Sequence, residues 1–272
     1  ITILLFAWLT HKTNHYAADR QKRTIVLFCL TDLNHSCDLI NMNPQIIIIA
    51  DQNEGEIAPV TYELIACARG LQQFTDANIK IIMTGYEQSD TVRQLSEQSG
   101  LDILVISPDY RTIPEESILK NIPASVFDAL NPSYVCMAHN SKGLDVAPGL
   151  AVKINAACIT GVEKITRTDD GICFTRSIYN DRITTQVIPA TKTSVLTIQS
   201  GIFKPDPSYK QNPGISQNAG KISTITLSLS ADNYQFIEFK SNPADTSALD
   251  NADVIVSAGN GISEKEDLDF IF

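Results

Sequence analysis

The stretch QIIIIAD, residues 45–51, indicates the class of fold. It contains four consecutive isoleucines, followed by Ala50 and the acidic residue Asp51. A continuous β-branched run of this kind is typical of a strand buried on both faces, as in a parallel sheet with helices on either side. The loop NEGEIAP follows, and Pro59 stands where the first turn of a helix tolerates proline. The pattern over 59–74 then predicts a helix with an apolar stripe at Val60, Leu64, Ala68 and Leu71.

The same alternation of strand and helix continues along the chain. Strands are predicted at 78–86, 101–107, 133–139 and 157–165. Helices are predicted from a cap at Ser89 to Ser99, over 114–130 with an interruption at Pro123, and over 146–156. Gly100 is expected to end the first of these helices. Strands separated by helices of this length imply right-handed crossovers and a parallel, Rossmann-like sheet.

From Cys158 onward the helical pattern disappears. Four short, turn-bounded runs follow: GICFTRSIYN (171–180), RITTQVIPA (182–190), TSVLTIQSG (193–201) and KISTITLSLS (221–230). Together they predict an antiparallel β extension of the sheet. Residues 203–220 are rich in Pro, Gly, Asn and Ser, which predicts a surface loop.

The pattern divides the chain into four parts. Residues 42–240 form the α/β domain, and 241–252 read as a linker. Residues 253–272 begin with DVIVSAGNG and predict the first strand, turn and helix of a second α/β domain, which is incomplete at Phe272. Residues 1–41 form an atypical extension. Either translation naturally starts at Met42, or the extension packs on the domain, and the sequence leaves both open.

Composition excludes several classes of function. The net charge is −10, and an acidic chain repels phosphate backbones, so nucleic acid is not an expected partner. The apolar opening ITILLFAWLT is too short to span a bilayer and lacks the flanks of a signal peptide. None of the six cysteines forms a CxxC pair, which favours a reducing compartment and argues against structural zinc.

Several stretches in the right order resemble one known family. They are IIIIADQNEGEIAPVTYELIACAR (46–69), HNSKGLDVAPGLAVKINAACITGVEKI (139–165), FTRSIYNDRITTQV (174–187) with SVLTIQSGIF (194–203), and VIVSAGNGISEKEDLDFI (254–271). From about Met42 to Phe272 the chain is similar to the alpha subunit of electron transfer flavoproteins.

The resemblance implies a redox electron carrier rather than an enzyme with its own substrate chemistry. Such a subunit pairs with a beta subunit and holds FAD in its second domain. It takes electrons from dehydrogenases, such as those acting on acyl-CoA in fatty acid β-oxidation, and passes them to a quinone reductase-type acceptor. The implied location is the cytoplasm of a prokaryote or the mitochondrial matrix. Whether electron pairs are split between two acceptors stays open.

The resemblance also implies a cofactor site at the end of the chain. Gly259, Asn260 and Gly261 form the turn that would contact FAD. The family turn usually reads Gly-Gly-Arg-Gly, and Asn260 stands at the position of the arginine. The cation that would stabilise a reduced, anionic flavin is therefore missing. Because most FAD-binding segments would lie beyond Phe272, this polypeptide alone is not expected to bind FAD tightly.

Two other readings of the chain stay open. One is a non-catalytic α/β scaffold for a partner subunit. The other is a nucleotide-binding domain without flavin. Such a domain would be expected to have a glycine-rich phosphate loop after its first strand, but the sequence there is DQNEGEIAP.

The remaining polar motifs have structural explanations that we favour. In residues 141–151, Ser141 and Asp145 are expected to cap a helix with Pro148 in its first turn, although the exposed amides could also receive an anion. His139 at a strand end is expected to be a hydrogen-bonded structural residue rather than a catalytic base. Asp51, Glu54 and Glu56 are expected to be a solvated loop rather than a cation site, because calcium-loop spacing is absent.

Two further sets of residues also have structural explanations. Thr175, Arg176 and Tyr179 are expected to be solvated or ion-paired strand residues, with subunit contact as the functional alternative. Cys136 and Cys158 are expected to lie in the core, where a free thiol packs as a small hydrophobe.

Overall fold

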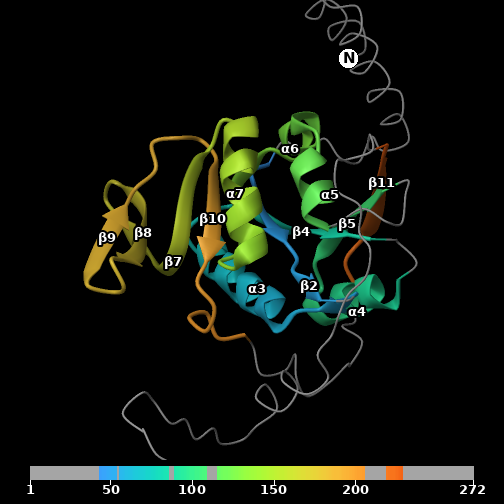
Figure 1. The fold of residues 1–272 in the computed structure, drawn as a ribbon, viewed down its shortest axis with the longest axis horizontal. Coiled ribbons are helices and arrows are strands. Elements are labelled where there is room, and N and C mark those ends of the chain that lie inside the picture. Colours follow the sequence, from blue (N-terminus) through green and yellow to red (C-terminus); the bar gives the residue numbers. More distant parts are fainter. Residues whose placement is uncertain (1–42, 54, 86–88, 109–114, 206–218, 229–272) are drawn as a thin grey trace, which may run out of the picture. The chain divides into compact units, whose positions relative to one another are not determined.

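One mixed sheet forms the framework of the protein (Figure 1). The fold is that of a computed structural model, which describes residues 43–53, 55–85, 89–108, 115–205 and 219–228. Within these ranges nine strands join in the order β11-β5-β4-β1-β6-β10-β7-β8-β9. All neighbours from β11 to β7 run parallel, and only the pairs β7–β8 and β8–β9 are antiparallel. The predicted parallel α/β sheet with an antiparallel extension is confirmed.

The strands follow the predicted runs closely. Their bounds are β1 (Gln45–Ile49), β4 (Asn78–Thr84), β5 (Asp102–Pro108), β6 (Pro132–Ala138), β7 (Ala157–Thr168), β8 (Gly171–Ile178), β9 (Ile183–Val187), β10 (Ser194–Ile198) and β11 (Ile222–Leu227). After β1, the short strands β2 (Gln52–Asn53) and β3 (Glu56–Ile57) form a separate antiparallel pair.

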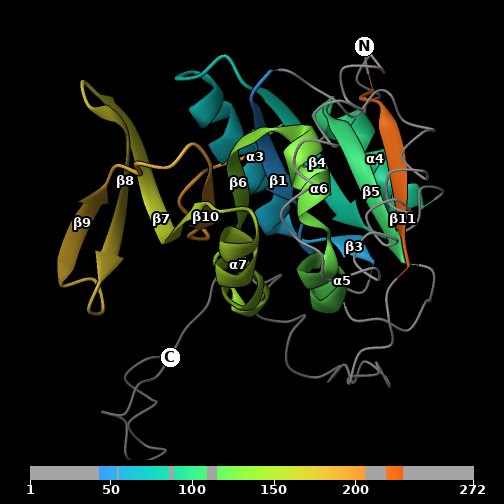
Figure 2. The same cartoon turned by 90° about the horizontal axis from the view of Figure 1, so that it is seen from above.

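The helices lie in two layers, one on each face of the sheet. α3 (Pro59–Gln72) and α4 (Asp90–Ser99) cover one face. α5 (Glu115–Asn121), α6 (Ala124–Leu130) and α7 (Ser141–Lys153) cover the other, as Figure 2 shows. The two covered faces explain why β1 has no polar alternation.

The isoleucines of β1 supply both cores. Ile46 and Ile48 pack with α3 and α4, whereas Ile47 and Ile49 pack with the helices of the opposite face. None of the four is more than 4% exposed. Burying one such side chain stabilises the fold by roughly 1.5–3 kcal/mol.

The helix interruption at Pro123 is confirmed. α5 ends at Asn121, and Pro123 takes the extended N-cap position of α6, with φ −62° and ψ 145°. Proline lacks an N–H and fixes φ, so it cannot continue α5 but can precede a new helix.

α4 confirms one of its two predicted ends. Gly100 closes it in the left-handed region with φ 66°. Ser89 has the backbone of an N-cap, but its side chain makes no capping hydrogen bond, so the predicted cap at Ser89 is wrong in that respect.

α7 starts five residues earlier than predicted. Its cap is Asn140, whose side chain accepts the N–H of Gly143, so neither Ser141 nor Asp145 caps the helix. Pro148 consequently lies inside the helix rather than in its first turn. The prediction placed the start at the first apolar residue, whereas a polar first turn with a good cap continues the helix toward its N-terminus.

Two strands of the predicted antiparallel extension are parallel. β10 lies between β6 and β7 and runs parallel to both. β11 pairs in parallel with β5 at the opposite edge of the sheet. All five residues of β10 are buried, as a central strand requires. Only β8 and β9 confirm that part of the prediction.

Several predictions fall outside the described residues. They are the extension 1–41, the linker 241–252, the incomplete second domain 253–272 and most of the surface loop 203–220. Among the residues that the structure describes, no helix has both the length and the apolar character needed to cross a membrane.

Candidate functional site

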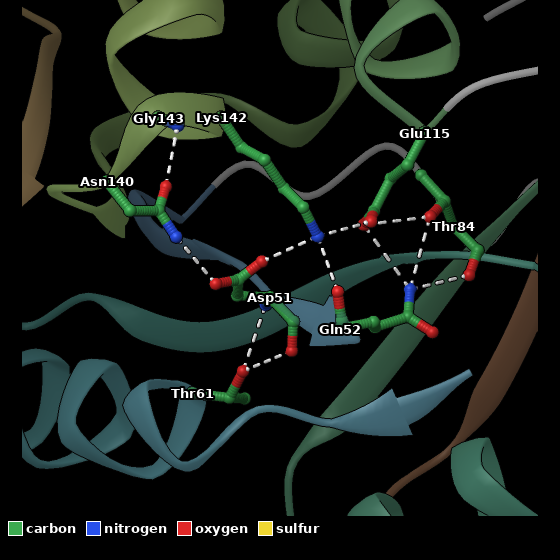
Figure 3. A network of polar contacts seen from close by, with 8 residues as sticks. All are labelled: Asp51, Gln52, Thr61, Thr84, Glu115, Asn140, Lys142 and Gly143. Atoms are coloured by element: carbon green, nitrogen blue, oxygen red, sulfur yellow. Dashed lines mark hydrogen bonds and ion pairs between the residues drawn. The ribbon is translucent and has the colours of Figure 1, made fainter. Parts of the chain in front are cut away.

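The carboxyl ends of β1 and β6 meet where the order of the strands reverses. From β1 the chain adds β4 and β5 on one side, and then crosses through α5 and α6 to β6 on the other side. Open α/β sheets bind ligands in the crevice outside the carboxyl ends of strands at such a reversal. Polar side chains from the ends of these strands and from the first turns of α5 and α7 gather there (Figure 3). We call this group the Lys142 network.

The ammonium of Lys142 lies at the centre of the network. Its Nζ donates to Oδ1 of Asp51 and to Oε2 of Glu115, each at 3.0 Å, and also to the carbonyl oxygen of Gln52. An ammonium has three N–H donors, so these three oxygens use all of them. The side chain of Lys142 is 25% exposed, while Asp51 is 10% and Glu115 19% exposed. The charges are therefore largely withdrawn from solvent.

Asp51 connects β1 to α3 and α7. Its Oδ2 accepts the side-chain amide N–H of Asn140 at 2.7 Å. Its backbone N–H donates to Oγ1 of Thr61, and that hydroxyl donates back to the backbone oxygen of Asp51, both at 2.9 Å. The expectation that Asp51 belongs to a solvated loop is wrong, because these partners compensate its burial. Glu56 is exposed, and Glu54 lies outside the described residues.

Glu115 connects α5 to β4. Its Oε1 accepts the hydroxyl of Thr84 at 3.1 Å, and the side-chain N–H of Gln52 approaches it at 3.4 Å. The same Gln52 nitrogen donates to the backbone oxygen of Thr84 at 2.9 Å. The network therefore joins the ends of β1, β4 and β6 to the starts of α3, α5 and α7.

The pKa shifts show how burial and pairing compete. Burial raises the pKa of Glu115, and the charge and hydrogen bond of Lys142 only partly offset that effect. For Lys142, burial is the largest single influence and lowers its pKa. The charges and hydrogen bonds of Glu115 and Asp51 together outweigh it, so the pKa of Lys142 is raised. Lys142 is thus a fixed cation and not a nucleophilic amine.

Gly143 brings the start of α7 against the end of β6. A Cβ at this position would overlap the carbonyl oxygen of Ala138, well inside the 3.0 Å limit for real Cβ contacts. The absence of a side chain therefore allows α7 to present Asn140 and Lys142 directly over β1.

Little space is left in the crevice. A pocket of about 20 Å³ lies beside the network, bounded by Asp51, Glu115, Lys142 and the apolar side chains of Ile49, Leu119, Met137 and Val146. That volume holds about one water molecule. In the described part of the chain no group of three or more His, Cys, Asp or Glu side chains could hold a metal ion. The network can orient the loops that it joins.

His139 is hydrogen-bonded as predicted. Its Nδ1 lies 2.8 Å from Oγ1 of Thr197, which also accepts the N–H of Gly161 at 3.0 Å. Thr197 is fully buried, and its hydroxyl thus links the ring of His139 to the backbone of β7. Burial, and then the charge of Arg176, lower the pKa of His139, which favours the neutral ring.

Thr175, Arg176 and Tyr179 do not form one site. Thr175 is buried, and its Oγ1 has no hydrogen-bond partner among the described residues; the same holds for the buried Nε of Arg176. Tyr179 is 73% exposed and opens a turn in which Tyr179, Asn180 and Asp181 all have positive φ, from 52° to 60°. Arg176 is half-buried and makes no ion pair within the described ranges, so its solvated or ion-paired character and its part in a subunit contact both stay predictions.

Of the two cysteine predictions, the one for Cys136 is confirmed and the one for Cys158 is not. Cys136 lies in the core as predicted, next to Cys67, and both are fully buried free thiols. Cys158, the second residue of β7, is exposed, so the prediction for Cys158 is wrong.

The predicted cofactor residues Gly259, Asn260 and Gly261 lie outside the described residues. The sequence analysis missed Lys142 and Glu115, which are far apart in the chain. Their positions in the first turns of helices that follow strands were the available signal, because such turns meet at one edge of a parallel sheet.

Comparison with known proteins agrees with the fold. The family model described as electron transfer flavoprotein domain matches residues 46–230. The electron transfer flavoprotein subunit alpha of Methylophilus methylotrophus is 26% identical over 227 residues, covering 83% of this chain and 68% of the relative. The corresponding subunit of Bacillus subtilis is 24% identical over 226 residues, covering 83% and 67%. A probable mitochondrial alpha subunit of Cryptococcus neoformans is 24% identical over 228 residues, covering 83% and 63%.

The chain thus spans about two thirds of the length of these relatives. Apart from Gln45, the first residue of β1, the matched region contains every described helix and strand, including β10 and β11. On this evidence the chain belongs to the electron transfer flavoprotein family and resembles its alpha subunits.

Proposed function

We propose that this chain is the N-terminal part of an electron transfer flavoprotein alpha subunit. In the complete protein it pairs with a beta subunit and holds FAD in the domain that begins near Asp253. The flavin accepts electrons from dehydrogenases, such as those acting on acyl-CoA, and delivers them to a quinone reductase-type acceptor. The match of residues 46–230 to the electron transfer flavoprotein domain is the observation that carries this proposal.

The geometry of the sheet supports different roles for the two proposed domains, with the flavin held by the second domain. The switch-point crevice, where an α/β domain would bind a nucleotide, is filled by the Lys142 network and leaves about 20 Å³. We assign the flavin to a different site, the segment containing Gly259, Asn260 and Gly261, because the resemblance to the alpha subunits implies a cofactor turn there. The role of residues 43–228 is to support that segment and the partner subunit.

The chemistry of the proposed carrier belongs to the flavin. FAD supplies reversible electron uptake when bound, and the protein orients it and tunes its potential. Asn260 provides an amide where a cation would stabilise a reduced, anionic flavin. We therefore propose that Asn260→Arg raises the reduction potential of the bound flavin. Spectroelectrochemistry on the complete heterodimer measures this, and an unchanged or lower potential argues against placing Asn260 near the flavin ring.

The first experiment tests complex and cofactor together. The complete protein, including the second domain proposed to follow residue 253, is co-expressed with a beta-type subunit and purified. A yellow heterodimer that bleaches with dithionite and is reduced by a dehydrogenase supports the proposal. A stable but colourless heterodimer favours the second candidate, a scaffold without flavin, which the closed crevice also supports. A colourless monomer contradicts both.

A further inference from the structure

The crevice at the strand reversal contains three oxygens aimed at one point. They are Oδ1 of Asp51, Oε2 of Glu115 and the carbonyl oxygen of Gln52, and the Nζ of Lys142 occupies that point. Two of the oxygens carry a full negative charge when ionised, and all three are acceptors only. Such a tripod matches the three N–H bonds of a primary ammonium.

The walls of the crevice suit an alkyl chain. Ile49, Leu119, Met137 and Val146 line the adjoining pocket, which has room for about one water molecule. A charged head with three donors, followed by a short aliphatic stem, therefore fits both parts of the crevice. A quaternary ammonium has no N–H to donate and does not fit the tripod.

The remaining acceptors of the network are already used by other groups. Oδ2 of Asp51 accepts Asn140, and Oε1 of Glu115 accepts Thr84. These partners come from β6–α7 and β4, and they hold both carboxylates in place independently of Lys142. Shortening Lys142 would thus leave a preformed set of oxygens facing an enlarged pocket.

We propose that this crevice is a primary-ammonium site which the chain fills with its own Lys142, an intramolecular occupant that closes the switch point to other ligands. The inference is independent of the proposed flavin chemistry. When the lysine is shortened, the site binds a small primary alkylammonium in its place.

Chemical rescue tests the proposal on the full chain. Lys142→Ala opens the site, whereas Lys142→Met removes the charge but keeps a stem of similar length in the pocket. Lys153→Ala is the matched control, because Lys153 lies on the same helix and donates to the carbonyls of Lys120 and Ile122 rather than to carboxylates. Thermal unfolding is followed with methylammonium chloride or tetramethylammonium chloride at equal ionic strength.

Lys142→Ala is expected to have a lower melting temperature than the unaltered chain. Methylammonium, but not tetramethylammonium, should raise that melting temperature again, with a saturating dependence on its concentration. At a concentration ten times the Kd, its unfolding constant should fall about elevenfold. Lys142→Met and Lys153→Ala should respond equally to both salts. The proposal is overturned if methylammonium and tetramethylammonium act alike on Lys142→Ala, or if Lys142→Met is rescued as well.

A measurement on the unaltered protein tests the proposal even if Lys142→Ala fails to fold. The tripod should slow hydrogen exchange of the Lys142 ammonium, so a ¹⁵N-lysine spectrum at neutral pH should contain a protected NH₃⁺ signal that is absent from Lys142→Met. If all lysine ammonium signals exchange as fast as free lysine, the occupant described here is not bound, and the proposal is rejected.

Discussion

Two glycines of α7 should respond to alanine in opposite directions. At Gly143 an added Cβ meets the carbonyl of Ala138 inside the 3.0 Å limit, whereas at Gly149 it meets nothing within 4 Å. Both positions are helical, so the intrinsic gain from replacing glycine is about 1 kcal/mol at each site. The difference between the two variants therefore measures the close approach of α7 to β6.

The magnitude for Gly143→Ala follows from what must move. Overpacking against backbone costs about 1–3 kcal/mol. Lifting the first turn of α7 also removes the Asn140 cap, which contributes about 1 kcal/mol. With the helix-propensity gain subtracted, the free energy of unfolding should fall by about 1–3 kcal/mol. Gly149→Ala should raise it by up to about 1 kcal/mol.

Urea unfolding followed by circular dichroism at 222 nm measures both variants, and unchanged m-values show that the comparison is valid. If Gly143→Ala is as stable as the unaltered chain, the first turn of α7 does not lie against β6, and the geometry that positions Lys142 is refuted.

Three further changes test other parts of the structure. Because burial raises the pKa of Glu115, the stability that its proton provides is fully present below its ordinary value of 4.5 and is lost as pH rises through the raised value. Glu115→Gln should remove this pH dependence, and urea midpoints measured across that range check it; parallel curves for both proteins would contradict the shift. Phe174 is fully buried, and its ring contacts Tyr134 with centroids 5.7 Å apart. Phe174→Ala should therefore lower the free energy of unfolding by about 3–5 kcal/mol in the same assay. A decrease of less than about 1 kcal/mol would mean that β8 is not anchored in this core. Tyr179→Gly should leave stability unchanged or raise it by up to about 1 kcal/mol, because φ 55° is strained for tyrosine and its side chain is exposed; a clear loss of stability would show that Tyr179 has a packing role.

Local sequence patterns predicted where the helices and strands lie, but they did not predict which strands pair with each other in the sheet. The isoleucines of β1, the break at Pro123 and the left-handed end at Gly100 each depend on a few adjacent residues. The position of β10 depends on which long-range partners bury it, because SVLTI suits an interior strand in either direction. Its five positions are buried only because β10 pairs with β6 and β7, and that pairing fixes its direction.

The candidate site shows the same limit. Asp51 was visible in the sequence as the residue after a buried strand, yet its partners Asn140, Lys142 and Thr61 lie up to 91 positions away. A carboxylate alone on a loop is expected to be solvated, and only the folded sheet supplies the lysine that changes this. The start of α7 at Ser141 was missed because its polar first turn carries no apolar periodicity.

The insertion of β10 between β6 and β7 also bears on how the chain folds. β6 and β7 follow each other in sequence but never pair, since β10 separates them and pairs with both. When the chain has emerged from the ribosome only as far as residue 190, the edges of β6 and β7 that pair with β10 still lack their partner. Closing it requires residues 194–198, so cooperative folding should await their synthesis, and a nascent chain arrested just before them should be especially prone to aggregation.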